Sequence, residues 1–369
     1  MHYPAAYPVT SDARDRFIVD LRAPRPHHNA WRYQDLIVED ERTADGAVAR
    51  VGTVFLTGRE CPWRCVMCDL WRGTTVDDTP RGAIPAQVAA ARDEFHRRAD
   101  PVDNIKITQM KLYNAGSFFD PRAVPDADYD EIAAQLAGLE RLIVESHPAL
   151  IGPRVDRFLD ALGRDNTKHE ARAAARGRFP LLEVAMGLET AHAGALERLH
   201  KRMTLDDFAA AADRLRQRDV GLRVFLLVAP PFVPDDEQDA WLLRSIDVAL
   251  DCGAGVVSLV PTRSGNGAME ALTAAGEFRQ PCLADIERSV DAAFSRVTSH
   301  EPRATSHKPR APRVFVDVWD LERFADCPQC LDARRARLQA MNLEQRVLAP
   351  VACPHCGTSH EPRATSPRP

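Results

Sequence analysis

Apolar runs rich in β-branched residues alternate with longer amphipathic segments along most of the chain. From residue 51 onward, six runs are almost continuously apolar, as expected of strands that are buried on both faces. They cover residues 51–57, 105–110, 142–146, 181–186, 222–228 and 256–260. Between them, apolar residues recur at helical spacing, for example over 205–215 and 242–250. The alternation predicts an α/β fold, a partial (β/α)6 barrel that is similar to a TIM barrel but smaller.

The segments before and after these repeats differ in composition. Residues 36–50 predict a strand that turns at Asp45-Gly46 into the first barrel strand, and an apolar stripe over 286–297 predicts a closing helix. The octapeptide SHEPRATS occurs at 299–306 and again at 359–366, and its polarity predicts disorder in both places. We therefore expect an N-terminal extension with a strand (1–48), the barrel (49–296), a Pro/Arg-rich linker (297–312), a cysteine-containing module (313–358) and a disordered tail (359–369).

Composition narrows the class of protein. With 45% hydrophobic residues, the 369-residue chain can bury one large core and a small accessory module. A net charge of −5 argues against binding nucleic acid through overall charge, although it leaves a local basic groove open. No apolar run approaches the roughly 18 residues of a membrane span, and the N-terminus has no signal-peptide pattern. We expect a cytoplasmic protein that does not bind a membrane.

Seven of the nine cysteines fall in three tight clusters. Such a number of cysteines in a reducing compartment is not expected to form a disulfide framework. Gaps of two and three residues between cysteines are instead typical of metal ligation. The clustered cysteines are Cys61, Cys65 and Cys68, then Cys327 and Cys330, then Cys353 and Cys356.

The first cluster has three cysteines and directly follows the predicted strand at 51–57. A structural zinc ion needs four ligands, and no fourth cysteine or histidine lies nearby at ligand spacing. Thiolates are also the usual ligands of iron–sulfur clusters, and three of them on a four-iron cluster leave one iron open. An iron–sulfur site is therefore our interpretation, with a zinc knuckle completed by a distant ligand as the alternative.

The stretch C61-P-W-R-C-V-M-C68 resembles the radical SAM signature, Cys-x3-Cys-x-Φ-Cys. The resemblance implies that Cys61, Cys65 and Cys68 hold a [4Fe-4S] cluster whose open iron binds S-adenosylmethionine. It also implies an electron donor such as flavodoxin or ferredoxin, whose electron cleaves S-adenosylmethionine to a 5′-deoxyadenosyl radical that abstracts hydrogen from a substrate. The residue before the last cysteine is usually aromatic and here is Met67, which can still pack on an adenine.

Motifs at the other strand ends add to the resemblance. N114-A-G-S117 is similar to the glycine-rich motif that holds the methionine amino group, with an ordinary Asn/Gly turn as the alternative. The third strand ends in E145-S-H-P, where a strand stop is the alternative, and the fourth in M-G-L-E189-T, where the alternative is an acid at a helix N-terminus. The resemblance implies cofactor-binding roles for Met67, Asn114, Ala115, Gly116, Ser117, Ser146 and Glu189.

Two cationic stretches lie near these motifs. Residues 193–203 predict a helix on which Arg198, Lys201 and Arg202 form a solvated face, unless one of them meets the carboxylate of S-adenosylmethionine. Arg263, after the sixth strand, either holds substrate or belongs to a plain loop.

Together, the strand-end motifs over about 52–293 resemble one branch of the superfamily. This branch contains the archaeosine-synthase radical SAM subunit and, more distantly, the elongator catalytic subunit. The resemblance implies a tRNA base or its adduct as substrate, and hence RNA modification. A small metabolite, a peptide or a cofactor precursor is the alternative substrate, and a non-catalytic, metal-dependent RNA-binding protein is the alternative class. We do not expect an elongator-type activity, because no acetyltransferase-like segment follows.

The last four cysteines form two Cys-x2-Cys pairs, C327-P-Q-C330 and C353-P-H-C356. Four thiolates in two such pairs suit a closed tetrahedral zinc site, and we expect a zinc-ribbon-like module. An auxiliary iron–sulfur cluster is the alternative. Residues 334–346 between the pairs predict a helix with a basic face, which is either solvated or touches RNA phosphates. His355 reads as a loop residue, not a ligand.

Overall fold

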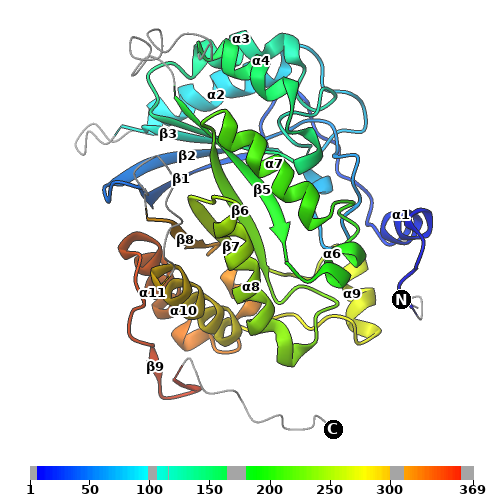
Figure 1. Cartoon of the computed structure of the whole chain (residues 1–369), viewed down its shortest axis with the longest axis vertical. Helices are drawn as coiled ribbons and strands as arrows, with labels where there is room; N and C mark the ends of the chain where they lie inside the picture. Colours follow the sequence, from blue (N-terminus) through cyan, green and yellow to red (C-terminus); the bar gives the residue numbers. More distant parts are fainter. Residues whose placement is uncertain (1–5, 99–105, 115, 164–179, 300–310, 359–369) are drawn as a thin grey trace.

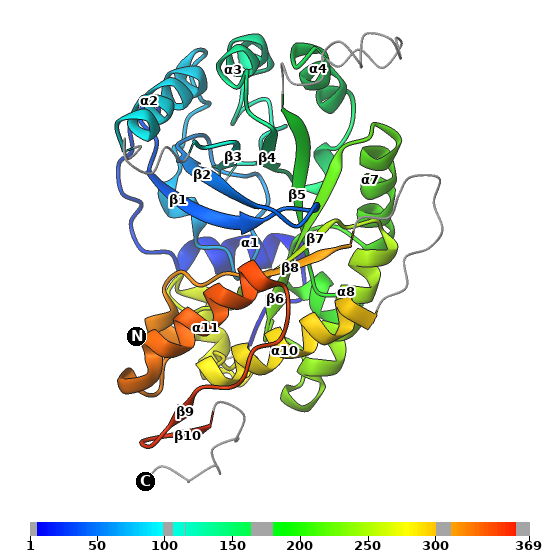
Figure 2. The same cartoon turned by 90° about the vertical axis from the view of Figure 1, so that its left-hand side faces the viewer.

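The computed structural model describes residues 6–98, 106–114, 116–163, 180–299 and 311–358. Its centre is an eight-stranded sheet that curls into a nearly closed barrel, with the strands in chain order from β1 to β8 (Figures 1 and 2). The strands are β1 (Asp35–Arg42), β2 (Val48–Leu56), β3 (Gln109–Asn114), β4 (Arg141–Glu145), β5 (Leu181–Glu189), β6 (Gly221–Val228), β7 (Val256–Pro261) and β8 (Arg313–Val316). The predicted barrel-like α/β fold is confirmed.

The six predicted barrel strands correspond to β2–β7, and all of them pair in parallel. The predicted hairpin is also present, because β1 pairs antiparallel with β2 and Gly46 in the turn has a φ of +88°. One boundary was wrong: β3 begins at Gln109, not at residue 105. Ile107 packs against the apolar core without joining the ladder, and an apolar run alone does not distinguish these two states.

Helices cover the outer face of the barrel (Figure 2). Outward-facing residues such as Val54, Leu112 and Leu226 form one core with apolar residues of these helices, including Phe158 and Phe208. Each strand therefore buries both faces, which explains the nearly continuous apolar runs. The α-helices are α1 (Ser11–Asp20), α2 (Ala83–Arg98), α3 (Tyr129–Gln135), α4 (Pro153–Ala161), α6 (Ala193–Arg198), α7 (Leu205–Gln217), α8 (Gln238–Asp251), α9 (Ala268–Ala274), α10 (Leu283–Ser299) and α11 (Leu331–Glu344).

A network of buried charges fills the end of the barrel interior away from the C-terminal strand ends. The ammonium of Lys111 on β3 contacts Glu39 and Glu41 on β1, and the guanidinium of Arg223 on β6 contacts Glu41 and Glu183. Burial alone would raise the pKa of Glu41, but Arg223 and Lys111 hold it well below its usual range. The network ties β1 across the interior to β3 and β6.

The C-terminal segment shares the main sheet. β8 pairs in parallel with β7, and on its other side the side-chain amides of α11 bond its backbone. Asn342 accepts from the Val316 N–H and donates to the Val316 carbonyl, each at 2.9 Å. Gln345, just beyond α11, does the same for Val314 at 2.9 and 2.8 Å. The predicted domain limits stay a prediction, but the segment from residue 313 is continuous with the barrel sheet.

The predicted basic face on the helix between the last cysteine pairs was wrong. Arg334 and Arg337 on α11 are buried, and they contact Glu287, which is fully buried on α10. Arg337 also contacts Asp291 at 2.7 Å. These arginines attach α11 to α10, beside which it lies in Figures 1 and 2, and are not available to phosphates.

Within the described residues, no helix is long and apolar enough to cross a membrane. Most of the predicted linker, the predicted tail and both SHEPRATS copies lie outside the described residues, apart from Ser299 at the end of α10.

Candidate metal and cofactor site

Cys61, Cys65 and Cys68 lie on the loop that follows β2, at the C-terminal end of the barrel strands. All three are half-buried, and desolvation raises the pKa of each thiol to about 12. Such thiols are deprotonated by binding a cationic metal centre. The loop offers three uncharged sulfur ligands that a metal centre would convert to thiolates.

The cysteine loop is fixed from several neighbouring elements. Glu60, directly before Cys61, contacts Arg22, Arg25 and Arg64. The Val66 N–H donates to the Leu199 carbonyl at 3.0 Å.

The same loop is held from beyond β7. The buried side-chain amide of Asn266 donates to the Val66 carbonyl at 2.7 Å and the Cys68 carbonyl at 3.3 Å. Contacts with three segments therefore preorganise the backbone of the cysteine loop. They are the segment after α1, the segment after α6 and the loop after β7.

An aromatic stack joins the cysteine loop to the end of β4. The rings of Trp63 and His147 lie with their centroids 3.7 Å apart and their planes 9° apart. The His147 Nδ1 accepts the Ala149 N–H, so its Nε2 carries the proton and donates to the Lys201 carbonyl at 2.9 Å. Desolvation lowers the pKa of His147 to about 3, so the imidazole is neutral. Neither residue was singled out from the sequence.

The predicted glycine-rich motif follows β3. Asn114 is buried, and within the described residues neither its Oδ1 nor its Nδ2 has a hydrogen-bond partner. Buried amides are nearly always paired, so the Asn114 amide could bind a ligand through its free donor and acceptor. At Gly116 an added Cβ would lie 2.3 Å from the Arg59 carbonyl oxygen, so only glycine fits there. Ala115 lies outside the described residues.

Ser117 and Ser146 are buried but already engaged with the backbone. Ser117 has a φ of +63°, and its hydroxyl accepts the His147 N–H at 3.0 Å. The Ser146 hydroxyl donates to the His147 carbonyl at 3.2 Å. Both serines therefore shape the end of β4. Glu145 directly precedes Ser146. Desolvation raises the pKa of Glu145 to about 8, although a hydrogen bond from the Asn114 backbone acts in the opposite direction.

Glu189 forms a buried ion pair with Lys201. Its Oε1 lies 2.5 Å from the Lys201 ammonium, and the two side chains are 9% and 10% exposed. Burial disfavours the ammonium, but Glu189, together with Cys65 and Cys61, outweighs burial and the pKa of Lys201 is raised. The register of β5 shifts between Gly187 and Glu189, and Glu189 has a φ of +66°, which aims its carboxylate. A Cβ at Gly187 would lie 2.1 Å from the Glu189 Oε1, so glycine makes room for the pair.

The predicted solvated cationic face over 193–203 was therefore wrong for Lys201. The helix ends at Arg198, and positive φ angles at His200 and Arg202 turn the chain so that Lys201 points inward. Arg198 contacts Glu277, and Arg202 contacts Asp15, so both lie outside the cluster around Glu189.

Arg263 links the cysteine loop to the segment after β8. Its guanidinium contacts Asp69, one residue beyond Cys68, at 3.1 Å and Asp320 at 3.3 Å. Met67 is half-buried and packs in a second apolar cluster with residues such as Leu227 and Val260. No sequence pattern marked the Arg263 bridge, because its partners Asp69 and Asp320 are 194 and 57 residues away in the chain.

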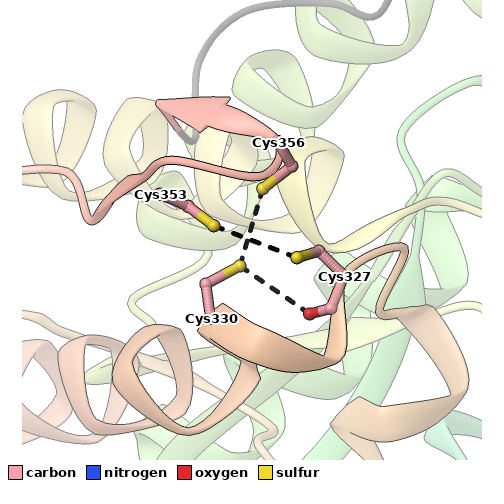
Figure 3. Close-up of side chains that lie close together, drawn as sticks. All are labelled: Cys327, Cys330, Cys353 and Cys356. Atoms are coloured by element: carbon pink, nitrogen blue, oxygen red, sulfur yellow. Dashed lines mark hydrogen bonds between the residues drawn. The ribbon is translucent and has the colours of Figure 1, made fainter.

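The four C-terminal cysteines converge from two segments (Figure 3). The Cys327 and Cys353 sulfurs are 3.9 Å apart, and the Cys330 and Cys356 sulfurs are 3.6 Å apart. Tetrahedral zinc–sulfur bonds of about 2.3 Å put sulfurs about 3.8 Å apart. In the described parts of the chain, these four cysteines are the one group of three or more His, Cys, Asp or Glu residues that could hold a metal ion, and their sulfur atoms all lie within 4.8 Å of one another. His355 does not belong to this group.

Comparisons with known proteins support the resemblance to archaeosine synthase that the strand-end motifs indicated. No protein-family model matches the chain. It is 24% identical over 268 residues to archaeosine synthase subunit beta of Methanosarcina acetivorans, covering 70% of this chain and 68% of that protein. It is 20% identical over 262 residues to an uncharacterised protein of Methanocaldococcus jannaschii. This match covers 68% of this chain and slightly less than two thirds (66%) of that protein. The resemblance to archaeosine synthase subunit beta is confirmed at the level of sequence.

A similar solved structure is the archaeal Elp3 of Methanocaldococcus infernus with an N-terminal deletion. It is 12% identical with a TM-score of 0.46, over 70% of this chain and 59% of that one. At this level the likeness carries no weight for function.

Proposed function

We propose that this protein is a radical SAM enzyme that binds a [4Fe-4S] cluster through Cys61, Cys65 and Cys68 and abstracts hydrogen from a tRNA nucleoside. The observation that carries the proposal is the unpartnered Asn114 amide at the strand ends that also bear the cysteine loop and the buried Glu189–Lys201 pair.

With the cluster and S-adenosylmethionine bound, the site would supply strongly reducing one-electron chemistry and a radical. The protein's own residues would bind and orient the cofactor. The Asn114 amide and the close backbone at Gly116 suit the amino group of the methionine moiety, and the Lys201 ammonium suits its carboxylate. The Glu189 carboxylate suits the ribose hydroxyls, and Met67 suits the adenine.

The tRNA substrate is supported by the relative named archaeosine synthase subunit beta. Because the chain spans about two thirds of the relatives it matches, the whole relatives' activities are not assumed. Flavodoxin or ferredoxin remains our proposed electron donor.

For the four C-terminal cysteines we propose a structural zinc ion. Sulfur–sulfur distances of 3.6 and 3.9 Å match a single tetrahedral metal, whereas an auxiliary iron–sulfur cluster would hold its ligands farther apart. The four ligands leave no open position for chemistry.

Anaerobic reconstitution with iron and sulfide, followed by S-adenosylmethionine and dithionite, tests the proposal. We expect iron–sulfur absorption and 5′-deoxyadenosine from the wild-type chain and from Cys252→Ala, a matched control at an isolated cysteine. Cys68→Ala should lose both signals. If Cys68→Ala behaves like the wild type, the catalytic assignment fails.

The substrate is tested separately by comparing the nucleosides of bulk tRNA from wild-type and knockout cells. A nucleoside that is missing or accumulates in the knockout supports tRNA. An unchanged profile instead favours a small metabolite, a peptide or a cofactor precursor.

A further inference from the structure

Aromatic side chains line the barrel interior near the cysteine loop, and the cofactor assignment uses none of them. The rings of Tyr113 on β3 and Phe225 on β6 are 6.1 Å apart, in an edge-to-face arrangement. Phe55 on β2 packs in the same interior cluster, with Ile143 and Ala185. Phe55 and Phe225 are only half-buried, so part of this lining is exposed.

The segment after β8 completes the lining. The ring of Trp319 lies 5.3 Å from that of Phe55 at 73°, and Trp319 is 36% exposed. Since Val314 and Val316 face the outer core, strand alternation directs Asp317 into the barrel. The Asp317 carboxylate accepts the backbone N–H of Trp319 at 2.9 Å, which ties the acid to the turn that carries the indole.

This aromatic corner lies close to the predicted cluster. Arg263 bridges Asp69, next to Cys68, and Asp320, next to Trp319. A half-exposed indole, a half-exposed phenyl ring and a carboxylate therefore share one side of the mouth. Flat apolar faces beside a hydrogen-bond acceptor fit a planar heterocycle that carries N–H donors.

We propose that Phe55 and Trp319 hold the target nucleobase of the tRNA, extruded from its stack, and that Asp317 accepts a hydrogen bond from an N–H on the edge of the base. This inference rests on the proposed function, because it names the ligand of the same active site. A base must leave the RNA stack to reach a buried reactive centre. Stacking on aromatic side chains contributes about 1–3 kcal/mol per base.

The experiment uses the reconstituted full-length protein and bulk tRNA from knockout cells as the probe. Filter binding should show that Trp319→Ala weakens tRNA binding by about 5- to 150-fold, the equivalent of the stacking energy. Trp319→Phe should stay close to the wild type. Trp241→Ala is the matched control, because Trp241 lies on α8 and contacts His192.

Ultraviolet cross-linking followed by nuclease digestion and mass spectrometry locates the contact. We expect a nucleotide adduct on the peptide that contains Trp319 or on the one that contains Phe55, and Asp317→Asn should change which tRNA nucleotide is captured. Cross-links that map elsewhere and persist in Trp319→Ala would overturn the inference.

Two further measurements separate the alternatives. If Trp319→Ala lowers thermal stability but binds tRNA as the wild type does, the aromatic pair only closes the barrel and the inference is wrong. The same preparations are assayed for 5′-deoxyadenosine without RNA. If the wild type forms it but does not bind tRNA, the nucleobase inference fails together with the tRNA substrate, while the assignment of the radical chemistry stands. If the wild type forms none, the proposed function fails, whatever the cross-links show.

Discussion

Trp63, between the first two cysteines of the loop, stacks on His147 with ring centroids 3.7 Å apart. Because the His147 Nε2 also donates to the Lys201 carbonyl, this one imidazole connects the cysteine loop, the end of β4 and the turn that carries Lys201. The geometry of the predicted cluster and that of the Glu189–Lys201 pair are therefore coupled through a neutral side chain.

His147→Ala should consequently lower the iron content after reconstitution and destabilise the protein by about 1–3 kcal/mol, through loss of the stack and a buried hydrogen bond. Iron analysis and urea unfolding measure the two effects. As a control, His192→Ala removes a ring contact with Trp241 outside the barrel and should leave iron content unchanged. Equal iron in His147→Ala and wild type would contradict the coupling.

Gly187→Ala should disrupt the Glu189–Lys201 pair. Its methyl group would lie 2.1 Å from the Glu189 Oε1 and 2.4 Å from the Lys201 Nζ, so the side chains must move apart. Overpacking of this kind costs about 1–3 kcal/mol, and we expect weaker binding of S-adenosylmethionine by calorimetry.

The matched control for this change is Gly255→Ala, because the nearest atom to its added methyl group is 4.0 Å away. We expect both its stability and its binding to stay near those of the wild type. Wild-type binding by Gly187→Ala would remove the pair from the cofactor site.

Glu145 should make stability depend on pH. Desolvation raises its pKa from 4.5 to about 8 in the folded protein, so the folded chain keeps a proton that the unfolded chain releases over this range. The extra free energy of unfolding that comes from the protonated Glu145 is fully present below pH 4.5 and is lost as the pH rises to about 8. Relative to Glu145→Gln, the wild type should therefore become less stable between pH 5 and 8. Urea midpoints of the two proteins at several pH values measure this, and parallel curves would count against the buried acid.

Removal of the C-terminal metal should loosen α11 and leave the cysteine loop intact. Cys330 directly precedes α11, and α11 in turn holds β8. Cys353→Ser should lose one zinc ion per chain, and hydrogen exchange should accelerate in peptides from 313–345 but not in those around 61–68. Cys282→Ser, at an isolated cysteine, is the control and should show neither change. Faster hydrogen exchange confined to the segment 352–358, which carries Cys353 and Cys356, would show that the metal does not support the barrel.

The barrel, the position of the first cysteine cluster after a strand and the convergence of the last four cysteines could be predicted because their signals are local. Parallel strands such as β6 are continuous apolar runs, and Cys61–Cys68 and the later Cys-x2-Cys pairs have short spacings. Lys201 was misassigned because a helical pattern of cations continued past Arg198, where the helix ends.

Other residues depended on partners that are distant in sequence. Arg337 is buried because Glu287 and Asp291 on α10 face it, and sequence periodicity does not reveal such partners. Trp319 falls within the predicted module at 313–358, and nothing in its sequence surroundings indicated that its ring packs on Phe55 of β2.

The two amides that bond β8 have a consequence for solubility. An unpaired strand edge is a template for pairing with other chains. Asn342 and Gln345 occupy the backbone groups of Val314 and Val316 with side chains, which cannot propagate a sheet. Loss of the proposed C-terminal metal would thus expose an unpaired strand edge as well as loosen a helix, and the protein would aggregate by strand addition while the loop of Cys61, Cys65 and Cys68 was still intact.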